Sequence, residues 1–402
     1  MENVLRSRKK ISTTPNINNN VKKATLNMRG LMKRRFGWKI LMYFAFMIVA
    51  LSLFYYESGK IDNFRINVIS KLSTSSKGRI NYQFPHIEKS DDIQACSHEI
   101  NLYIQFVLDD IKNDEKHIND FHNMICSLLK NTECKLKFFI LANTEGTKMM
   151  KEIVSNFEKN YKWFGSPSIV FLDYYRIGRS VVNYTKPMKE LFTTAINTYY
   201  SKSLFHLVPG LHRILPVTVD KVIAFDIDIL ILDDIQNLWD YFGNFSNDHL
   251  MALANEQQPV YYHLTNTYRE ESFDTIVGKP KPHGKPGLNG GVKLFNLESM
   301  RTNKVYNSLL DDPSKLVNLA DKYSFRGHLG DQDFYTLLSF EYPEWVLELP
   351  CSWNRQLCQW WKEYGYRDVF ELYSNCKEPY FILHGNCKTK INHTEFHDFL
   401  VK

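Results

Sequence analysis

The sequence predicts an α/β domain around a mixed, mainly parallel sheet, preceded by one membrane-spanning helix. Two observations indicate the sheet: short apolar runs resemble buried strands, and the segments between them carry apolar residues at helical spacing. Alternation of this kind favours βαβ units, in which the strands run parallel. The membrane helix is indicated by residues 40–56, which contain no charged residue.

The amino-terminal region is predicted to contain a cytosolic tail and the membrane helix. At about 1.5 Å per residue, a helix over 40–56 spans roughly 25 Å, which is short but sufficient for a thin bilayer. Residues 1–39 are rich in Lys and Arg, with Glu2 the only acid, so we expect this tail in the cytosol. A cleaved signal peptide is the alternative, although the basic leader is long for one. We expect a type II protein of the endoplasmic reticulum membrane, with the Golgi as second choice.

The net charge of +6 comes largely from this tail. It therefore indicates membrane orientation, and we expect no nucleic acid as a partner. Residues 57–92 are polar and are expected to form a lumenal stem, followed by one catalytic domain over 93–402. The sequence leaves the oligomeric state open.

The domain begins with apolar runs and helical patterns in alternation. Strands are expected at 102–108, 135–141, 168–172 and 222–225, and helices at 117–130, 146–161 and 187–200. Ligands of such sheets bind beyond the carboxyl ends of the strands.

Two carboxylates, Asp226 and Asp228, interrupt an apolar run over 221–232 that has the composition of a buried strand. A buried carboxylate costs several kcal/mol unless it is paired or coordinated. Two acids one residue apart at a strand end suit a hard divalent cation. A turn capped by Asp is the alternative interpretation.

Polar residues also mark the ends of three later apolar elements. Segment 286–296 contains Asn289 before two glycines and favours either a plain turn into a strand or close approach of a ligand. Segment 326–335 opens a helix that Asp331 or Asp333 would cap. His384 ends an apolar strand and is either structural or a third metal ligand.

Taken together these segments resemble the retaining glycosyltransferases of family eight, the glycogenin-like group with a GT-A-type, Rossmann-like nucleotide-sugar-binding fold. The resemblance covers essentially the whole lumenal domain. It is carried by Asp226-Ile-Asp228, Arg326-Gly-His-Leu-Gly-Asp-Gln-Asp-Phe334, Cys351-Ser-Trp-Asn-Arg-Gln-Leu-Cys358 and His384-Gly-Asn-Cys387.

The resemblance implies roles for individual residues. It implies Mn²⁺, with Mg²⁺ as a possible substitute, bound by Asp226, Asp228 and His384. The implied donor-binding residues are Asn289, Gly290, Gly385 and Lys388, and the implied catalytic residues are Gln332 and Asp331. Two positions depart from the family pattern: Gly290 stands where Ser is frequent, and many members carry a Lys further beyond the motif His than Lys388 lies.

The implied activity is transfer of xylose from UDP-xylose, with retention, to the xylose of xylosyl-glucose on EGF repeats of Notch-type proteins, in an α-1,3 linkage. Because Gln332 is a poor nucleophile, a front-face (SNi-like) path is favoured, with double displacement through Asp331 or Asp333 as the alternative. An aromatic cluster either contacts the acceptor or packs structurally; its members are Trp353, Trp360, Trp361, Tyr364 and Tyr366.

Two alternatives to this activity stay open. A related lumenal transferase with another donor or acceptor, such as a glucoside xylosyltransferase, would share the metal chemistry. A non-catalytic glycan-binding protein would need neither Asp226 nor His384.

All seven cysteines follow the membrane segment, which suits an oxidising compartment. For the last four we favour Cys351–Cys376 with Cys358–Cys387, since this pairing ties the segment from Trp353 to Trp361 to the strand that carries His384. A zinc site is disfavoured because paired C-x-x-C knuckles are lacking. Asn183, Asn244 and Asn392 begin glycosylation triplets.

Overall fold

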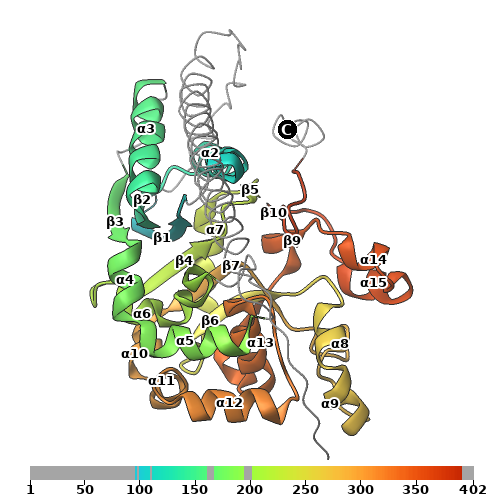
Figure 1. The fold of residues 1–402 in the computed structure, drawn as a ribbon. Helices are drawn as coiled ribbons and strands as arrows, with labels where there is room; N and C mark the ends of the chain where they lie inside the picture. Colours follow the sequence, from blue (N-terminus) through green and yellow to red (C-terminus); the bar gives the residue numbers. More distant parts are fainter. Residues whose placement is uncertain (1–95, 97–98, 109–110, 161–166, 194–201, 392–402) are drawn as a thin grey trace, which may run out of the picture. The chain divides into compact units, whose positions relative to one another are not determined.

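A seven-stranded sheet lies at the centre of the described part of the chain (Figure 1). The computed structural model describes residues 96, 99–108, 111–160, 167–193 and 202–391, all within a unit assigned to residues 81–402. The tail, membrane segment and stem expected over 1–92 lie outside these residues. Among the residues that are described, no helix is both long and apolar enough to span a bilayer.

The strand order of the large sheet is β3-β2-β1-β4-β7-β6-β8. Its strands are β1 (Glu99–Phe106), β2 (Lys135–Ala142), β3 (Ser168–Asp173), β4 (Lys221–Phe225), β6 (Met251–Asn255), β7 (Leu288–Asn296) and β8 (Val346–Leu349). β1 pairs in parallel with β2 and β4, and β2 with β3, whereas β7 runs antiparallel between β4 and β6. The sheet is therefore mixed and mainly parallel, as predicted, and the four expected strands form within a few residues of their expected bounds.

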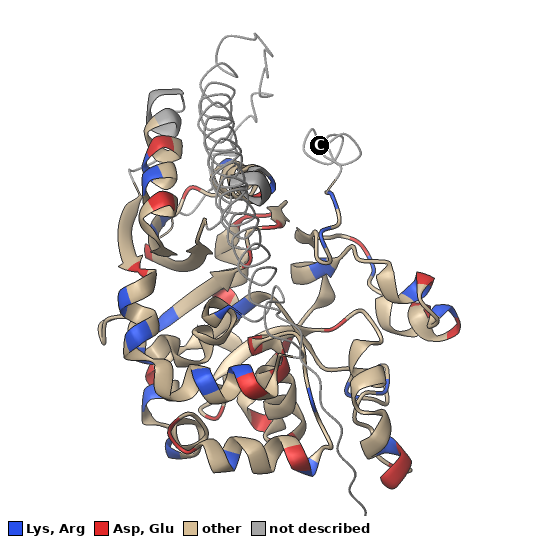
Figure 2. Cartoon of the chain, in the orientation of Figure 1, with Lys and Arg blue, Asp and Glu red and all other residues tan. Residues whose placement is uncertain are grey.

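The central strands are apolar on both faces because helices cover them. The helices near the first strands are α2 (Ile111–Lys130), α3 (Thr144–Asn160), α4 (Tyr174–Ser180) and α5 (Val182–Leu191). The later ones are α6 (Leu211–Ile214), α7 (Ile235–Trp239), α8 (Val260–Leu264), α9 (Asn266–Glu271), α10 (Leu297–Thr302), α11 (Lys304–Asp311), α12 (Pro313–Lys322), α13 (Asp331–Glu341), α14 (Trp360–Glu363) and α15 (Arg367–Ser374). Figure 2 shows basic and acidic residues interleaved along these helices.

The helices expected over 117–130 and 146–161 are present as α2 and α3. The helix expected over 187–200 begins earlier than expected, because α5 runs from Val182 to Leu191, and residues 194–200 of the expected helix lie outside the described residues. Because α5 begins at Val182, Tyr184 and Met188 lie one turn apart on the same face and both pack into the core. Burial of this apolar face explains where the helix begins. Pro187 therefore lies inside the helix and does not begin it.

The apolar run over 221–232 forms two strands and not one, which corrects the sequence interpretation. β4 ends at Phe225, and β5 (Ile229–Ile231) belongs to a separate three-stranded sheet of order β5-β10-β9. That sheet also contains β9 (Arg355–Gln356) and β10 (Ile382–His384). The backbone crosses between the sheets at residues 226–228, where the Asp226 N–H still donates to the Gly291 carbonyl and the Gly385 N–H donates to the Asp228 carbonyl.

Disulfide bonds connect the segments around β9 and β10. Cys351 is bonded to Cys376 and Cys358 to Cys387, which is the connectivity favoured from the sequence. A further bond, Cys96–Cys134, was not anticipated. Of the candidate glycosylation residues, Asn183 and Asn244 are exposed and Asn392 lies outside the described residues.

Candidate functional site

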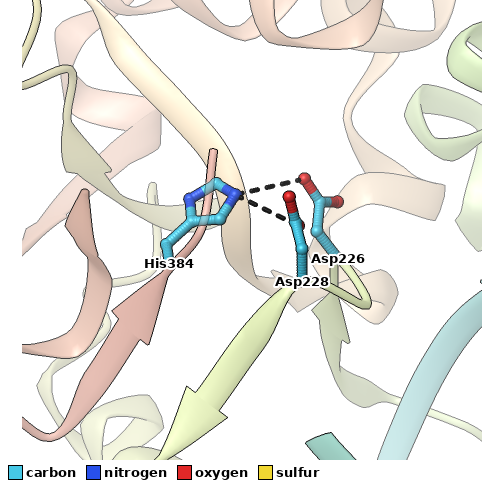
Figure 3. A group of neighbouring side chains, drawn as sticks. All are labelled: Asp226, Asp228 and His384. Carbon is cyan, nitrogen blue, oxygen red and sulfur yellow. Dashed lines mark ion pairs between the residues drawn. The ribbon is translucent and has the colours of Figure 1, made fainter. Parts of the chain in front are cut away.

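Asp226, Asp228 and His384 meet where the two sheets adjoin (Figure 3). The His384 Nε2 lies 3.5 Å from Asp228 Oδ1 and 3.9 Å from Asp226 Oδ2. The pairing of β10 with β5, which sets His384 opposite Ile229, brings the distant imidazole to the two acids. The side chains of Asp226 and Asp228 are 47% and 26% exposed, so they line a surface and are not buried in a strand as the sequence suggested.

The charges of this cluster stabilise one another. Burial opposes ionisation of Asp228, but the charge of His384 outweighs it and holds the pKa of Asp228 below its ordinary value. Burial likewise lowers the pKa of His384, and the charges of Asp228 and Asp226 reverse this and raise it. A site that favours two carboxylates and a cation fits a divalent metal, and oxygen plus imidazole donors suit Mn²⁺ among others.

Strand β7 packs closely against the imidazole ring. A Cβ added to Gly291 would lie 2.3 Å from His384 Cε1 and 2.4 Å from Nδ1, so only glycine leaves room for the ring. The same atom added to Gly290 would meet nothing closer than 3.5 Å. Asn289 and Gly290 lie within β7, while the turn that precedes the strand is at Gly287, whose φ is +89°. The segment over 286–296 therefore does form a turn into a strand, with the turn at Gly287 and with Asn289 and Gly290 inside the strand.

Lys293 brings a buried positive charge into this acidic site and was missed from the sequence. Its Nζ lies 3.3 Å from Asp226 Oδ1 and 3.9 Å from Asp331 Oδ2, and it donates to the Gly290 carbonyl. Burial lowers the pKa of Lys293, but the two carboxylates outweigh burial and raise it above its ordinary value. In the sequence, Lys293 could have been noticed because it is a charged residue inside the otherwise apolar second half of β7.

Replacing Lys293 with Met is expected to destabilise the fold by about 3 kcal/mol, because it leaves the buried Asp331 carboxylate without its partner. Adding Asp331→Asn should recover part of this loss. Urea unfolding of both single variants and the double variant measures the coupling. Strictly additive losses would show that the two side chains do not stabilise each other.

A second missed residue, Glu256, holds two side chains implied in donor binding or catalysis. Its Oε2 accepts from Asn289 Nδ2 at 2.9 Å and from Gln332 Nε2 at 3.0 Å, while the Gly290 N–H donates to Gln332 Oε1 at 2.9 Å. Burial raises the pKa of Glu256 to about 7, against the effect of these donors. In the sequence, Glu256 could have been found as the first residue of a polar run, 256–258, that directly follows the buried strand β6.

Asp331 and Asp333 open α13, but neither caps it. The N-cap is Gly330, with φ +69° and no side-chain bond. Asp333 is fully buried and accepts from the Leu329 N–H at 2.7 Å and the Tyr261 hydroxyl at 3.0 Å. Asp331 faces Lys293, and burial raises its pKa to about 6. The proposed cap is thus wrong, and Asp333 instead fixes the loop before the helix.

Gly385 and Lys388 follow His384. The Gly385 N–H bonds the Asp228 carbonyl at 2.7 Å, and a Cβ there would lie 2.6 Å from the Thr389 carbonyl oxygen. Lys388 is exposed in the turn after β10, with φ +61°. Gly385 therefore helps to join β10 to the segment that carries Asp228.

The aromatic cluster expected from the sequence divides into two parts. Trp353 is 2% exposed and packs against Phe381 with ring centroids 4.7 Å apart, so its assignment to acceptor binding is wrong. Trp360 and Tyr364 are 47% and 63% exposed and stack on each other at 4.6 Å. Trp360 begins α14 and Tyr364 directly follows it, and in Figure 1 α14 lies with α15 to the right of β9.

Comparisons with known proteins agree with this geometry. Over 223 residues the chain is 43% identical to xyloside xylosyltransferase 1 of Mus musculus and 42% identical to that of Homo sapiens, covering 56% of this chain. The matches cover 57% and 56% of those proteins, so the chain spans about half the length of the curated relatives it matches.

Comparison of the fold with solved structures also finds similarity to a xyloside xylosyltransferase. The crystal structure of the apo form of mouse xyloside xylosyltransferase 1 superposes with a TM-score of 0.68 at 35% identity, covering 73% of this chain and 100% of that one. This likeness confirms a GT-A-like α/β glycosyltransferase fold. Residues 111–385, more than half of the chain, match the model described as glycosyl transferase family 8. The chain belongs to glycosyl transferase family 8.

Proposed function

We propose that the protein is a retaining α-1,3-xylosyltransferase, moving xylose from UDP-xylose to the xylose of xylosyl-glucose on EGF repeats of Notch-type proteins. The observation that carries the proposal is the cluster of Asp226, Asp228 and His384 in a family 8 chain that is 43% identical to a xyloside xylosyltransferase. The presence of all three metal-binding side chains supports catalysis over a glycan-binding protein without activity.

The two carboxylates and the imidazole are ligands that suit Mn²⁺, which when bound would neutralise a diphosphate leaving group. Asp226, Asp228 and His384 would hold it. Lys293 adds a fixed positive charge beside them that also favours an anionic donor. Asn289 and Gln332, oriented by Glu256, would bind the donor sugar.

Retention is assigned to a front-face path. The bond from the anomeric carbon to the phosphate oxygen breaks, the bond to the acceptor hydroxyl oxygen forms, and the hydroxyl proton passes to the departing phosphate. Gln332 Oε1 already accepts from the Gly290 N–H, which fixes the amide dipole and leaves a lone pair free to stabilise positive charge at the anomeric carbon. Asp333 is too deeply buried to act as the nucleophile of a double displacement, which leaves Asp331 as the alternative nucleophile.

Replacing Gln332 with Ala is expected to lower kcat by about 10²-fold to 10³-fold without abolishing transfer, because one preorganised dipole is lost. Steady-state kinetics with the proposed donor and acceptor measure the loss. A covalent xylosyl-enzyme on Asp331, trapped with a slow donor analogue and found by mass spectrometry, would contradict the front-face path.

The exposed pair Trp360 and Tyr364 is proposed to contact the acceptor. Stacked aromatic faces bind sugar rings and apolar protein surfaces, and both side chains are exposed.

We also propose that residues 40–56 anchor the protein in the endoplasmic reticulum membrane as a type II protein, since disulfides suit the lumen. Protease added to sealed microsomes should remove only the amino-terminal tail. Digestion of the region around Cys351 without detergent would contradict this orientation.

A donor-by-acceptor assay tests the function. UDP-xylose with an EGF repeat that carries xylosyl-glucose should give trisaccharide in the presence of Mn²⁺, and UDP-glucose should give little. Preference for a repeat that carries glucose alone would identify a glucoside xylosyltransferase instead. Absence of transfer from any nucleotide sugar would contradict the proposal.

A further inference from the structure

A chain of buried amides connects the backbone of β7 to the imidazole of His384. Asn289 Oδ1 accepts from the Gly291 N–H at 3.0 Å and from Asn354 Nδ2 at 2.9 Å. Asn354 Oδ1 lies 3.0 Å from His384 Nδ1. Asn289, Asn354 and His384 are each at most 4% exposed, so water does not replace these bonds.

The direction of each bond follows from groups that can act in one way only. The Gly291 N–H can only donate, so the oxygen of Asn289 must face it and the nitrogen of Asn289 must face away. That nitrogen meets Glu256 Oε2, an acceptor, which agrees with the orientation from the other end. Asn354 must then present its nitrogen to Asn289 and its oxygen to His384.

The imidazole of His384 thus faces an oxygen at Nδ1, which requires a hydrogen on Nδ1. In a neutral imidazole the other nitrogen, Nε2, then carries the lone pair. It is Nε2 that faces Asp228 and Asp226.

We propose that Asn354 is a positioning residue that, held by Asn289, keeps His384 in the Nδ1–H tautomer and so makes Nε2 a metal-binding atom. The proposal rests on the proposed metal-dependent function and adds to it a residue that touches neither metal nor donor. Groups that accept a hydrogen bond from the non-ligating ring nitrogen of a metal-binding histidine commonly fix its tautomer and ring orientation in this way.

The relay is needed because the carboxylates oppose the ligating tautomer. Asp226 and Asp228 offer Nε2 only acceptors, so an imidazole without a partner at Nδ1 would place its hydrogen on Nε2, between the ring and the metal position. The imidazole cannot rotate away from the carboxylates, because β7 packs against the ring at Gly291.

Two substitutions at Asn354 separate this role from simple packing. Asn354→Leu keeps the branching and the number of side-chain heavy atoms but offers no acceptor to Nδ1. Asn354→Asp keeps an acceptor at Nδ1 while placing a second oxygen against Asn289 Oδ1. A residue that only fills space would respond to both changes alike, whereas the relay predicts that they differ.

The probe is Mn²⁺ alone, titrated into the full-length protein in detergent and followed by electron paramagnetic resonance and calorimetry, without donor or acceptor. Asn354→Leu is expected to weaken Mn²⁺ binding by about 10-fold to 100-fold. Asn354→Asp should bind Mn²⁺ at least as tightly as the wild type. The matched control is Gln258→Leu, a buried amide whose Nε2 donates to the Cys358 carbonyl outside the relay, and it should leave Mn²⁺ affinity unchanged.

The outcomes are distinguishable. Unchanged affinity in Asn354→Leu, with normal binding by the wild type, overturns the relay and leaves the proposed function standing. If Asn354→Leu does not fold, Asn354→Asp decides, because weak binding by a folded Asp variant also overturns the relay. A wild-type protein that does not bind Mn²⁺ overturns the metal site itself, and the relay with it.

Discussion

Replacing Asp226 and Asp228 together with Asn is expected to lower the rate of sugar transfer by about 10³-fold or more, while the protein stays folded. The loss follows from the removal of two of the three charged or imidazole ligands in the cluster, because metal stabilisation of a leaving group supplies several kcal/mol. The protein should stay folded because both side chains are partly exposed, although it should lose some stability because the buried Lys293 and His384 lose carboxylate partners.

The measurement pairs initial rates at saturating Mn²⁺ with thermal unfolding. Asp248→Asn, an exposed Asp on the turn before β6, is the matched control and should leave both unchanged. Transfer by the double variant at near wild-type rates, still dependent on Mn²⁺, would show that the metal binds elsewhere.

Replacing Gly291 with Ala is expected to abolish Mn²⁺ binding and activity. The new methyl group would lie 2.3 Å from His384 Cε1, which is closer than any real contact, so either the imidazole or strand β7 must move. The ring is the terminal part of a side chain, while β7 is hydrogen-bonded on both sides, so we expect the ring to be displaced from the two carboxylates.

Gly290→Ala is the control for this change, since it adds the same methyl group one residue earlier, where the nearest atom is 3.5 Å away. Mn²⁺ titration and thermal unfolding of both variants give the comparison. Retained Mn²⁺ affinity in Gly291→Ala would contradict the assignment of His384 as a ligand. Equal loss in both variants would attribute the effect to β7 as a whole.

The parts of the fold that depend on local composition could be predicted. The four parallel strands β1 to β4 are mainly apolar, and the burial of β1, β2 and β4 within the sheet favours that composition. The cluster of Asp226, Asp228 and His384 was anticipated because each of these residues follows or ends an apolar element. Its geometry still depended on the β5–β10 pairing, which separates sequence neighbours and joins distant segments.

The residues that were missed or misread act through partners far away in the sequence. Lys293 and Asn354 appear ordinary in their own segments, and their roles come from Asp226 in one case and His384 in the other. Trp353 was grouped with Trp360 because of proximity in the chain. Trp353 lies in the short turn that begins at the disulfide-bonded Cys351 and is buried, whereas Trp360 begins α14, after β9, and is exposed.

The arrangement of β5 has a consequence for the order in which the protein matures. Within the part of the chain that the structure describes, β5 pairs with β10 alone, and β10 follows it by about 150 residues. As the chain is synthesised from its amino terminus, Asp226 and Asp228 are therefore made long before His384 can reach them. We therefore expect the metal site to be completed late, when β10 docks against β5. A nascent protein that has formed only its large sheet should not bind Mn²⁺, so recovery of Mn²⁺ binding during refolding would report completion of the whole domain.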